Sequence, residues 1–213
     1  VVGSSIQRPR FLRVNAAARL GRACEDGGMR LLVAALASEL QAFPESLEGF
    51  ERLVTGPGKL KAAYGLTRAL DAAGYEEIVV VGTAGGVDPE LPGGVYEITA
   101  AIQHDVQDLD GVVGQHVSLP PRVATGRDGL IIATGDSFVD DVAVVERIRG
   151  LGGVLVDMET YAYVWVADQF GVPIRVLRAI SDTAQDGATT VWDETVAACS
   201  VQLRDRIRDE YGV

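Results

Sequence analysis

Cysteine and histidine are scarce in this sequence, which has two of each: Cys24, Cys199, His104 and His116. Two cysteines this far apart do not form the disulfide framework of a small secreted protein. A cysteine–histidine metal site needs about four ligands at short, regular spacings, and these four residues do not provide them. We therefore expect neither a metal nor any other cofactor, and a reducing, intracellular setting.

Long apolar runs are also missing. No stretch approaches the roughly 20 residues that are needed to span a bilayer. The first 28 residues carry five arginines but no apolar core, so they do not resemble a secretory signal. These absences predict a soluble cytoplasmic protein without a membrane partner.

Positive charge is in short supply. Lys and Arg number 19 against 30 Asp and Glu, which gives a formal net charge of -11. Such a surface repels the phosphate backbone of nucleic acids, so the sequence argues against a general nucleic-acid binder. A small nucleoside carries no phosphate and is compatible with this charge.

The 213 residues, 47% of them hydrophobic, suit one globular domain with a sizeable core. Strands alternate with helices of 10–20 residues, which predicts an α/β domain with a largely parallel sheet. We expect Asp140 to cap one helix, and Gly171 with Pro173 to end another. The expected strands are 30–36, 77–81, 95–103, 129–133, 154–156 and 174–179, and the expected helices are 59–73, 140–149, 160–170 and 191–211.

Residues 1–28 differ from the rest because they show no regular pattern and end in Glu-Asp-Gly-Gly. They could be a flexible or helical extension. Alternatively, Met29 is the natural start, and the upstream part is an artefact of translation. In either case we expect 1–28 to lie outside the α/β domain, 29–213, and to carry no chemistry.

Ligands of parallel α/β sheets bind outside the carboxyl ends of the strands, so the residues at these ends are the candidates for a site. Glu39 follows the first strand; taken alone, it is more simply a first-turn helix residue favoured by the helix dipole. The small residues 82–86 follow the next buried strand. They form either a turn or a gap that admits a flat ligand against the backbone.

Other strand ends carry similar signals. The loop 55–59 has two glycines that allow close approach to a ligand, but it lacks the Ser/Thr of a P-loop and the third glycine of a dinucleotide site. Phe138 could stack on an aromatic base or fill the core. Asp157 and Glu159 could simply cap a helix, and Asp182 could be a loop cap or a catalytic carboxyl. The joint placement of these residues favours function.

Together, the segments resemble the nucleoside phosphorylase/nucleosidase superfamily, and most closely a shortened 5'-methylthioadenosine/S-adenosylhomocysteine nucleosidase. They follow the family's order and are Ala-Ser-Glu-Leu (37–40), Thr-Gly-Pro-Gly-Lys (55–59), Val-Gly-Thr-Ala-Gly-Gly (81–86), Thr-Gly-Asp-Ser-Phe-Val (134–139), Val-Asp-Met-Glu-Thr (156–160) and Arg-Ala-Ile-Ser-Asp (178–182). The resemblance implies a three-layer α/β/α sandwich with a mixed, largely parallel twisted sheet. It also implies hydrolysis of the N-glycosidic bond of an adenine nucleoside and a homodimer.

By this resemblance, Asp182 is the general acid at purine N7 and Glu39 the general base that activates water. Asp182 must then hold a proton near neutral pH, which burial favours. The other implied residues contact or support the substrate. They are Glu159 at the ribose hydroxyls, Met158 at the sugar face, Phe138 stacked on adenine, Val139 at the base edge, Ser181 beside Asp182, Arg178 near the water and the acidic pair, Trp192 over the base, Thr83 in place of the family's usual Ser, and Ala84 and Gly85 beside it.

Two departures leave the 5' substituent open. Only 15 residues separate Glu39 from Thr55, where the family has a longer segment that includes a strand pair, and the segment after His104 also differs. The accepted 5' group could be methylthio, homocysteinyl, plain 5'-deoxy or a larger futalosine-type group.

The sequence alone leaves alternative functions open. A phosphorolytic purine nucleoside phosphorylase and a futalosine hydrolase are enzymes of the same superfamily, and a nucleoside storage protein is a non-catalytic relative. A storage protein has no reason to keep Glu39, Glu159 and Asp182 together. Phosphorylases carry an arginine where this chain has Val80, and enzymes for 6-oxopurines usually carry Asn where it has Asp182. The sequence therefore favours an adenine-specific hydrolase in which Glu39 and Glu159 compete for Arg178.

Overall fold

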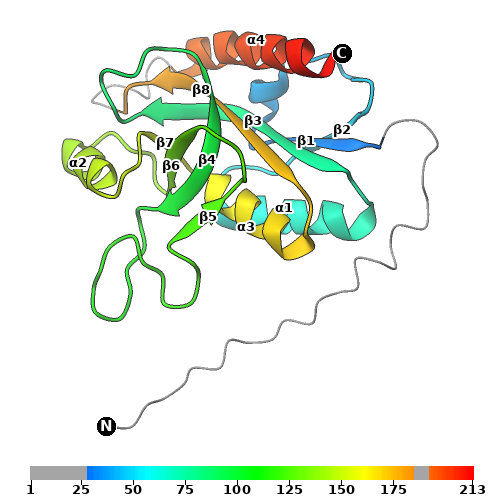
Figure 1. The fold of residues 1–213 in the computed structure, drawn as a ribbon. Helices are drawn as coiled ribbons and strands as arrows, with labels where there is room; N and C mark the ends of the chain where they lie inside the picture. Colours follow the sequence, from blue (N-terminus) through cyan, green and yellow to red (C-terminus); the bar gives the residue numbers. More distant parts are fainter. Residues whose placement is uncertain (1–27, 185–191) are drawn as a thin grey trace.

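The computed structural model describes residues 28–184 and 192–213 (Figure 1). Its strands are β1 (Arg30–Ala34), β2 (Phe50–Val54), β3 (Glu77–Gly86), β4 (Val95–Gln103), β5 (Arg122–Ala124), β6 (Leu130–Thr134), β7 (Leu155–Asp157) and β8 (Ile174–Asp182). Its helices are the 3₁₀ turn η2 (Ala37–Leu40) and the α-helices α1 (Lys59–Ala72), α2 (Val142–Gly150), α3 (Thr160–Phe170) and α4 (Trp192–Tyr211).

The strands form one mixed sheet in the order β2-β1-β3-β7-β6-β4-β5, and β8 pairs with both β3 and β4. Parallel pairs join β1 to β2 and β3, β3 to β8, and β6 to β4 and β7. Antiparallel pairs join β3 to β7, and β4 to β5 and β8. The predicted mixed, largely parallel sheet is confirmed.

The sheet also bends back on itself, which the sequence did not predict. β3 pairs with β1 over Glu77–Val80, with β8 from Ile78 to Gly85, and with β7 through its last residues, Gly85 and Gly86. A register shift between Ala84 and Gly85 marks the bend, as β-bulges commonly do. Strands β3, β8, β4, β6 and β7 therefore close a ring, and the pocket described below opens at one end of it.

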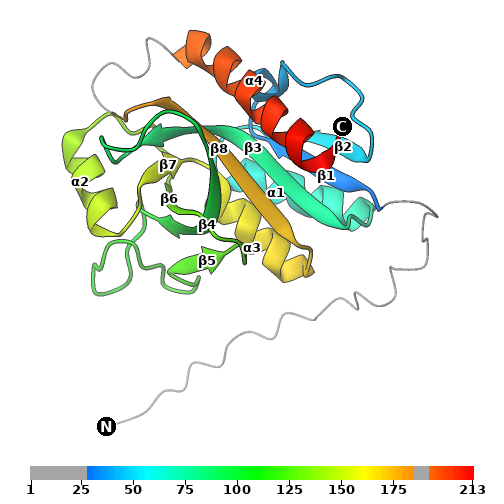
Figure 2. The same cartoon turned by 45° about the horizontal axis from the view of Figure 1, so that its top comes forward.

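Helices cover both faces of this sheet (Figures 1 and 2). In β1, Leu31 and Val33 face the cluster that includes α1 and α3, whereas Leu32 and Ala34 face the cluster that includes α4. All four are buried. Burial on both faces explains the continuous apolar run, because such a parallel strand has no solvent face. The three-layer α/β/α arrangement is confirmed.

Several expected boundaries need correction. β3 and β8 continue to Gly86 and Asp182 instead of ending at 81 and 179, so the segment 82–86 is strand and not a turn. The cap of α2 is Asp141, whose carboxylate accepts the Ala143 N–H, and not Asp140. β2 and β5, two short strands at the ends of the strand order, were not among the predicted strands. Gly171 ends α3 in the left-handed conformation, as predicted.

The shortened segment between Glu39 and Thr55 leaves β2 at one end of the strand order. Residues 41–49 contain no strand; an isolated bridge from Leu47 to Phe50 and two hydrogen bonds from Arg52, to the carbonyls of Leu40 and Pro44, hold them. Within residues 28–184 and 192–213, no helix is long and apolar enough to cross a membrane. Residues 1–27 and Val191 lie outside the described residues, so the expectations for them are not tested.

Candidate active site

A cavity of about 320 Å³ opens at the carboxyl ends of β1, β3, β7 and β8. Parallel strands deliver their carboxyl ends to one edge of a sheet, so segments far apart in sequence meet there. Ten of the predicted site residues line this cavity: Glu39, Thr83, Ala84, Gly85, Phe138, Val139, Met158, Glu159, Ser181 and Asp182. The structure therefore brings the candidate acid and the candidate base into the same cavity.

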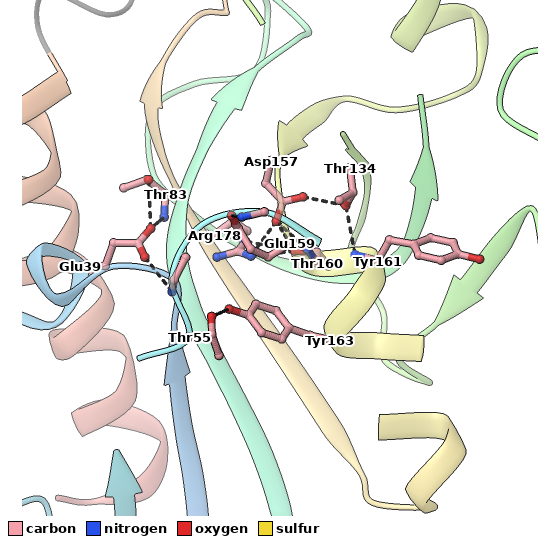
Figure 3. Close-up of polar contacts among 12 residues, drawn as sticks. Glu39, Thr55, Thr83, Thr134, Asp157, Glu159, Thr160, Tyr161, Tyr163 and Arg178 are labelled. Carbon is pink, nitrogen blue, oxygen red and sulfur yellow. Dashed lines mark hydrogen bonds and ion pairs between the residues drawn. The ribbon is translucent and has the colours of Figure 1, made fainter. Parts of the chain in front are cut away.

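Glu39 is buried and lies on η2, directly after β1. One carboxylate oxygen, Oε2, accepts the N–H groups of Ala35 and Leu36 at 3.1 and 2.9 Å. The other, Oε1, accepts the Thr83 N–H at 2.8 Å and the Thr83 hydroxyl at 3.1 Å (Figure 3). Four donors on one carboxylate fix its orientation. Glu39 is therefore held in place at the cavity wall.

Asp182 is the last residue of β8 and is partly buried. Its Oδ2 accepts the Ser181 hydroxyl at 2.8 Å, and its Oδ1 accepts the Ala184 N–H at 2.8 Å. Ser181 thus contacts Asp182, as the resemblance implied. A Cβ on Gly85 would lie 3.1 Å from Asp182 Oδ1, so the missing side chain at Gly85 gives the carboxyl its room.

Arg178 is completely buried and lies four residues before Asp182 on β8. Its Nη2 lies 2.6 Å from Asp157 Oδ2, and it also donates to the Thr160 hydroxyl at 2.8 Å. Burial works against its charge, but Asp157, Glu159 and Glu39 more than offset this, and the pKa of Arg178 is raised. The ion-pair partner is Asp157, and the expected competition between Glu39 and Glu159 for a direct pair is wrong.

Asp157 was considered only as a helix cap in the sequence analysis, and its central role was missed. Besides Arg178, it accepts the Thr134 hydroxyl at 2.7 Å and both the N–H and the hydroxyl of Thr160 at 2.9 and 2.5 Å (Figure 3). The N-cap position of α3 is Glu159 and not Asp157, but Asp157 accepts the first N–H of the helix, that of Thr160. The sequence did hold a signal for this role, because Asp157 stands two residues before Glu159 in the same segment, Asp-Met-Glu.

Glu159 precedes α3 and is buried in the cavity wall. Burial, followed by repulsion from Asp157, raises the pKa of Glu159 to about 7. Its Oε1 accepts the Gly58 N–H at 2.8 Å, so the loop 55–59 contacts Glu159. That leaves the other oxygen for a ligand, since a carboxylate has about four acceptor positions. A carboxylate that titrates near neutral pH in a cavity is a typical feature of functional sites.

The apolar part of the cavity includes Phe138 and Val139, in the loop after β6. Phe138 is 44% exposed and lines the cavity, so it is not a core residue, whereas Val139 is buried.

Lys59 holds the loop after β6 in place: its N–H donates to Asp136 at 2.8 Å, and its ammonium lies 2.7 Å from Asp105. Asp105 in turn accepts the Asp136 N–H. The sequence did not predict this cluster, although Lys59 belongs to the glycine-containing loop 55–59.

Trp192 is the first residue of α4, but its side chain lies outside the described part of the structure, so its predicted contact with the base stays a prediction. No group of three or more His, Cys, Asp or Glu side chains in the described residues is arranged to hold a metal ion. Nor does any Lys or Arg line the cavity among these residues. The wall thus combines carboxylates with an apolar surface.

This combination defines the class: an α/β enzyme with several carboxylates and an apolar wall in one cavity at the strand ends. The family model of the phosphorylase superfamily matches residues 53–126 and 115–209, so the chain belongs to that superfamily. A 5'-methylthioadenosine/S-adenosylhomocysteine nucleosidase of Geobacillus thermodenitrificans is 35% identical over 185 residues, which cover 74% of this chain and 78% of the relative. The corresponding Bacillus subtilis nucleosidase is 32% identical over 73% and 77% of the two chains. The chain is therefore a member of this nucleosidase family of N-glycosidic hydrolases.

Solved structures agree with the fold. A 5'-methylthioadenosine/S-adenosylhomocysteine nucleosidase of Helicobacter pylori superimposes with a TM-score of 0.79 at 21% identity, over 88% of this chain and 99% of that one. A futalosine hydrolase of the same organism gives a TM-score of 0.78 at 20% identity, over 86% and 97%. At these identities the likeness concerns the fold, which both activities share.

Proposed function

We propose that this enzyme hydrolyses the N-glycosidic bond of an adenine nucleoside, with Asp182 as general acid and Glu39 as general base. The observation that carries the proposal is that these two carboxyl groups line one cavity whose remaining wall includes Phe138 and Val139. An aromatic side chain at a cavity wall can stack on a purine. The products are adenine and the 5-substituted ribose.

The acid step takes place at adenine. As the C1'–N9 bond breaks, its electron pair moves into the base, and protonated Asp182 donates its proton to N7. The other Asp182 oxygen can accept from the 6-amino group, which favours adenine over a 6-oxopurine. Ser181 and the Ala184 N–H orient the carboxyl. A positioned general acid typically contributes ~10²–10⁴-fold in rate.

The base step takes place at the sugar. Water adds its oxygen to C1' of the oxocarbenium-like sugar and gives up a proton to Glu39. Four donors hold the Glu39 carboxylate, and the Thr83 hydroxyl is the one that can rotate away to contact the water. This division between an acid and a base resembles the carboxyl pair of inverting glycosidases.

The ribose and the 5' group occupy the rest of the cavity in this proposal. Glu159 accepts hydrogen bonds from the ribose hydroxyls through the oxygen that Gly58 leaves unused, and Met158 packs on the sugar face. Leu36 and Pro57 add apolar wall for the 5' substituent. An apolar wall favours methylthio or plain 5'-deoxy groups, and the names of the relatives favour methylthioadenosine and adenosylhomocysteine as substrates.

Hydrolysis is favoured over phosphorolysis by the charges around the sugar site. Phosphate needs arginine side chains or a nest of N–H groups. Arg178 is engaged by Asp157, and Val80 stands at the position where phosphorylases carry an arginine. The N–H groups of Ala35 and Leu36 are taken by Glu39. A buried carboxylate there repels phosphate but suits neutral water.

We further propose a homodimer that works in the cytoplasm in methionine salvage. Leu60 and Tyr64 on α1, and Leu109 and Val117 in the segment after His104, are exposed apolar side chains. Exposed apolar side chains offer the kind of surface that a subunit interface buries. The proposed unit is the domain 29–213, with residues 1–28 as an extension.

The deciding experiment compares base release in phosphate-free buffer with release in tens of millimolar phosphate (about 50 mM). Methylthioadenosine, adenosylhomocysteine, 5'-deoxyadenosine, aminofutalosine and inosine serve as substrates, and the sugar product is identified by mass. We expect adenine and free 5-substituted ribose at equal rates in both buffers. A strict phosphate requirement with a ribose-1-phosphate product would establish a phosphorylase instead, and no release from any substrate would support a storage protein.

A further inference from the structure

Helix α4 contacts the backbone that carries Glu39 through one buried serine. The Ser200 hydroxyl donates to the Glu39 carbonyl oxygen at 2.8 Å and accepts the Ala42 N–H at 3.0 Å. Ser200 is completely buried, although it is separated from Glu39 by 161 residues of sequence. Buried side chains that satisfy two backbone groups at once fix the geometry of the segment they bind.

The turn that carries Glu39 needs such support. η2 spans only the residues 37–40, and isolated helical turns of this length are unstable in water. The carbonyls of Ser38 and Leu40 accept the N–H groups of Gln41 and Phe43, just after the turn. The Glu39 carbonyl accepts from the Ser200 hydroxyl instead, and a buried carbonyl without a donor would be costly. Glu39 is thus held at two points: by its carboxylate on the cavity side and by its carbonyl on the α4 side.

The neighbouring residue of α4 approaches the acid in the same way. The Cys199 thiol is buried and lies 3.5 Å from the Ile180 carbonyl, two residues before Asp182 on β8. Burial raises the pKa of this thiol, and the nearby carboxylates of Asp182 and Glu39 raise it further. Consecutive residues of one helix therefore lie against the two segments that carry the acid and the base.

We infer that Ser200 is a positioning residue for Glu39, and that α4 fixes the base relative to the acid. The inference rests on the proposed function, because it assigns Ser200 to the step in which Glu39 takes a proton from water. A displacement of about 1 Å at a catalytic group can cost ~10²-fold in rate. The hydroxyl of Ser200 acts through the backbone of Glu39 and contacts no substrate.

Two variants test the hydrogen bonds separately from packing. Ser200→Ala removes the oxygen, and Ser200→Cys keeps an atom at the γ position but replaces the hydroxyl by a larger group that is a much weaker donor and acceptor. We expect both to lower kcat for adenine release by ~10–100-fold. KM and the affinity for adenine should stay near wild type, because Asp182, Phe138 and Glu159 are untouched.

The control is Ile207→Val, which removes one methyl group from the buried cluster on α4 and breaks no hydrogen bond to the Glu39 backbone. It should lower Tm but leave kcat unchanged. Wild-type kcat in Ser200→Cys would overturn the inference, as would a loss of adenine affinity that parallels the loss of kcat. If Ser200→Ala does not fold, Ser200→Cys decides. A wild-type enzyme that releases no base overturns the proposed function itself, and the inference with it.

Discussion

Arg178 and Asp157 form an ion pair that is almost completely excluded from solvent, with Nη2 and Oδ2 2.6 Å apart. The pair joins β8 to the end of β7 (Figure 3). Asp157 itself lines the cavity that holds Glu39, Glu159 and Asp182. Arg178 also explains a glycine in the sequence. A Cβ on Gly82 would overlap Arg178 Nη1, so only glycine leaves space for the guanidinium beside β3.

The pair predicts a large loss of stability for Asp157→Asn. Removing one partner leaves an uncompensated charge in the interior, which typically costs about 3–5 kcal/mol. We expect this decrease in the free energy of unfolding, measured by urea denaturation. Asp205→Asn is the matched control, because Asp205 pairs with Arg204 at the surface and such pairs contribute about 1 kcal/mol or less. Equal losses in the two variants would contradict the prediction.

Asp182→Asn tests the acid. The substitution keeps the shape but removes the proton for N7, so we predict at least a ~10²-fold decrease in the rate of adenine release. Release is followed by the absorbance change of free adenine, and Tm reports on folding. Asp128→Asn, at an exposed position, is the control and should retain full activity. Near-normal turnover in Asp182→Asn would remove the assignment of the acid.

Glu39→Gln tests the base. The glutamine NH₂ group must replace one of the two carboxylate oxygens. In the place of Oε2 it would face the N–H groups of Ala35 and Leu36, and in the place of Oε1 it would face the N–H of Thr83, so donor meets donor in either case. We therefore expect lower stability, by about 1–3 kcal/mol, since hydrogen bonds are lost in a buried place. Single-turnover adenine release at saturating substrate should fall by ~10²-fold or more, while the nucleoside still binds. Lost binding with unchanged turnover of bound substrate would make Glu39 a binding residue instead.

The pH dependence of nucleoside binding tests Glu159. Its pKa is raised to about 7, and only the ionised carboxylate can accept two ribose hydroxyls. Binding to the inactive Asp182→Asn variant should therefore weaken by about tenfold for each pH unit below 7, because the ionised fraction falls in that proportion. Equilibrium dialysis across pH 5–8, roughly two units below that pKa and one above, measures the effect.

The same raised pKa of Glu159 predicts the opposite pH dependence for the stability of the fold: stability decreases as the pH rises, whereas nucleoside binding becomes tighter. The fold favours protonated Glu159, so its contribution is fully present below the ordinary pKa of 4.5 and is lost as the pH rises through about 7. Glu159→Gln cannot ionise and should flatten both profiles. A Glu159→Gln variant with the wild-type pH dependence of binding would assign the titration to another group.

A chain that begins at Met29 tests the domain boundary. Residues 1–28 supply none of the proposed chemistry, so the shortened chain should fold and keep its specific activity. Circular dichroism, Tm and adenine release compare it with the full chain. An insoluble or inactive product would place the extension in the core or in a subunit contact.

The sequence by itself determined the α/β class, because continuous apolar runs and amphipathic helices follow from local chemistry. It also placed Glu39, Glu159 and Asp182 at strand ends, since parallel strands send these ends to one edge. Phe138 remained ambiguous between core and site, because one apolar side chain without periodicity carries no information about which side is open. Only its exposure and its place at the cavity resolved this.

The tertiary structure decided which of these residues act on one another. The Arg178–Asp157 pair joins residues 21 apart in sequence, and the Ser200–Glu39 bond joins residues 161 apart. No local pattern encodes such contacts, because they arise where the bend in β3 and the packing of α4 bring distant backbones together. The pKa of Glu159 likewise depends on burial and on Asp157, two properties that exist only once the chain has folded.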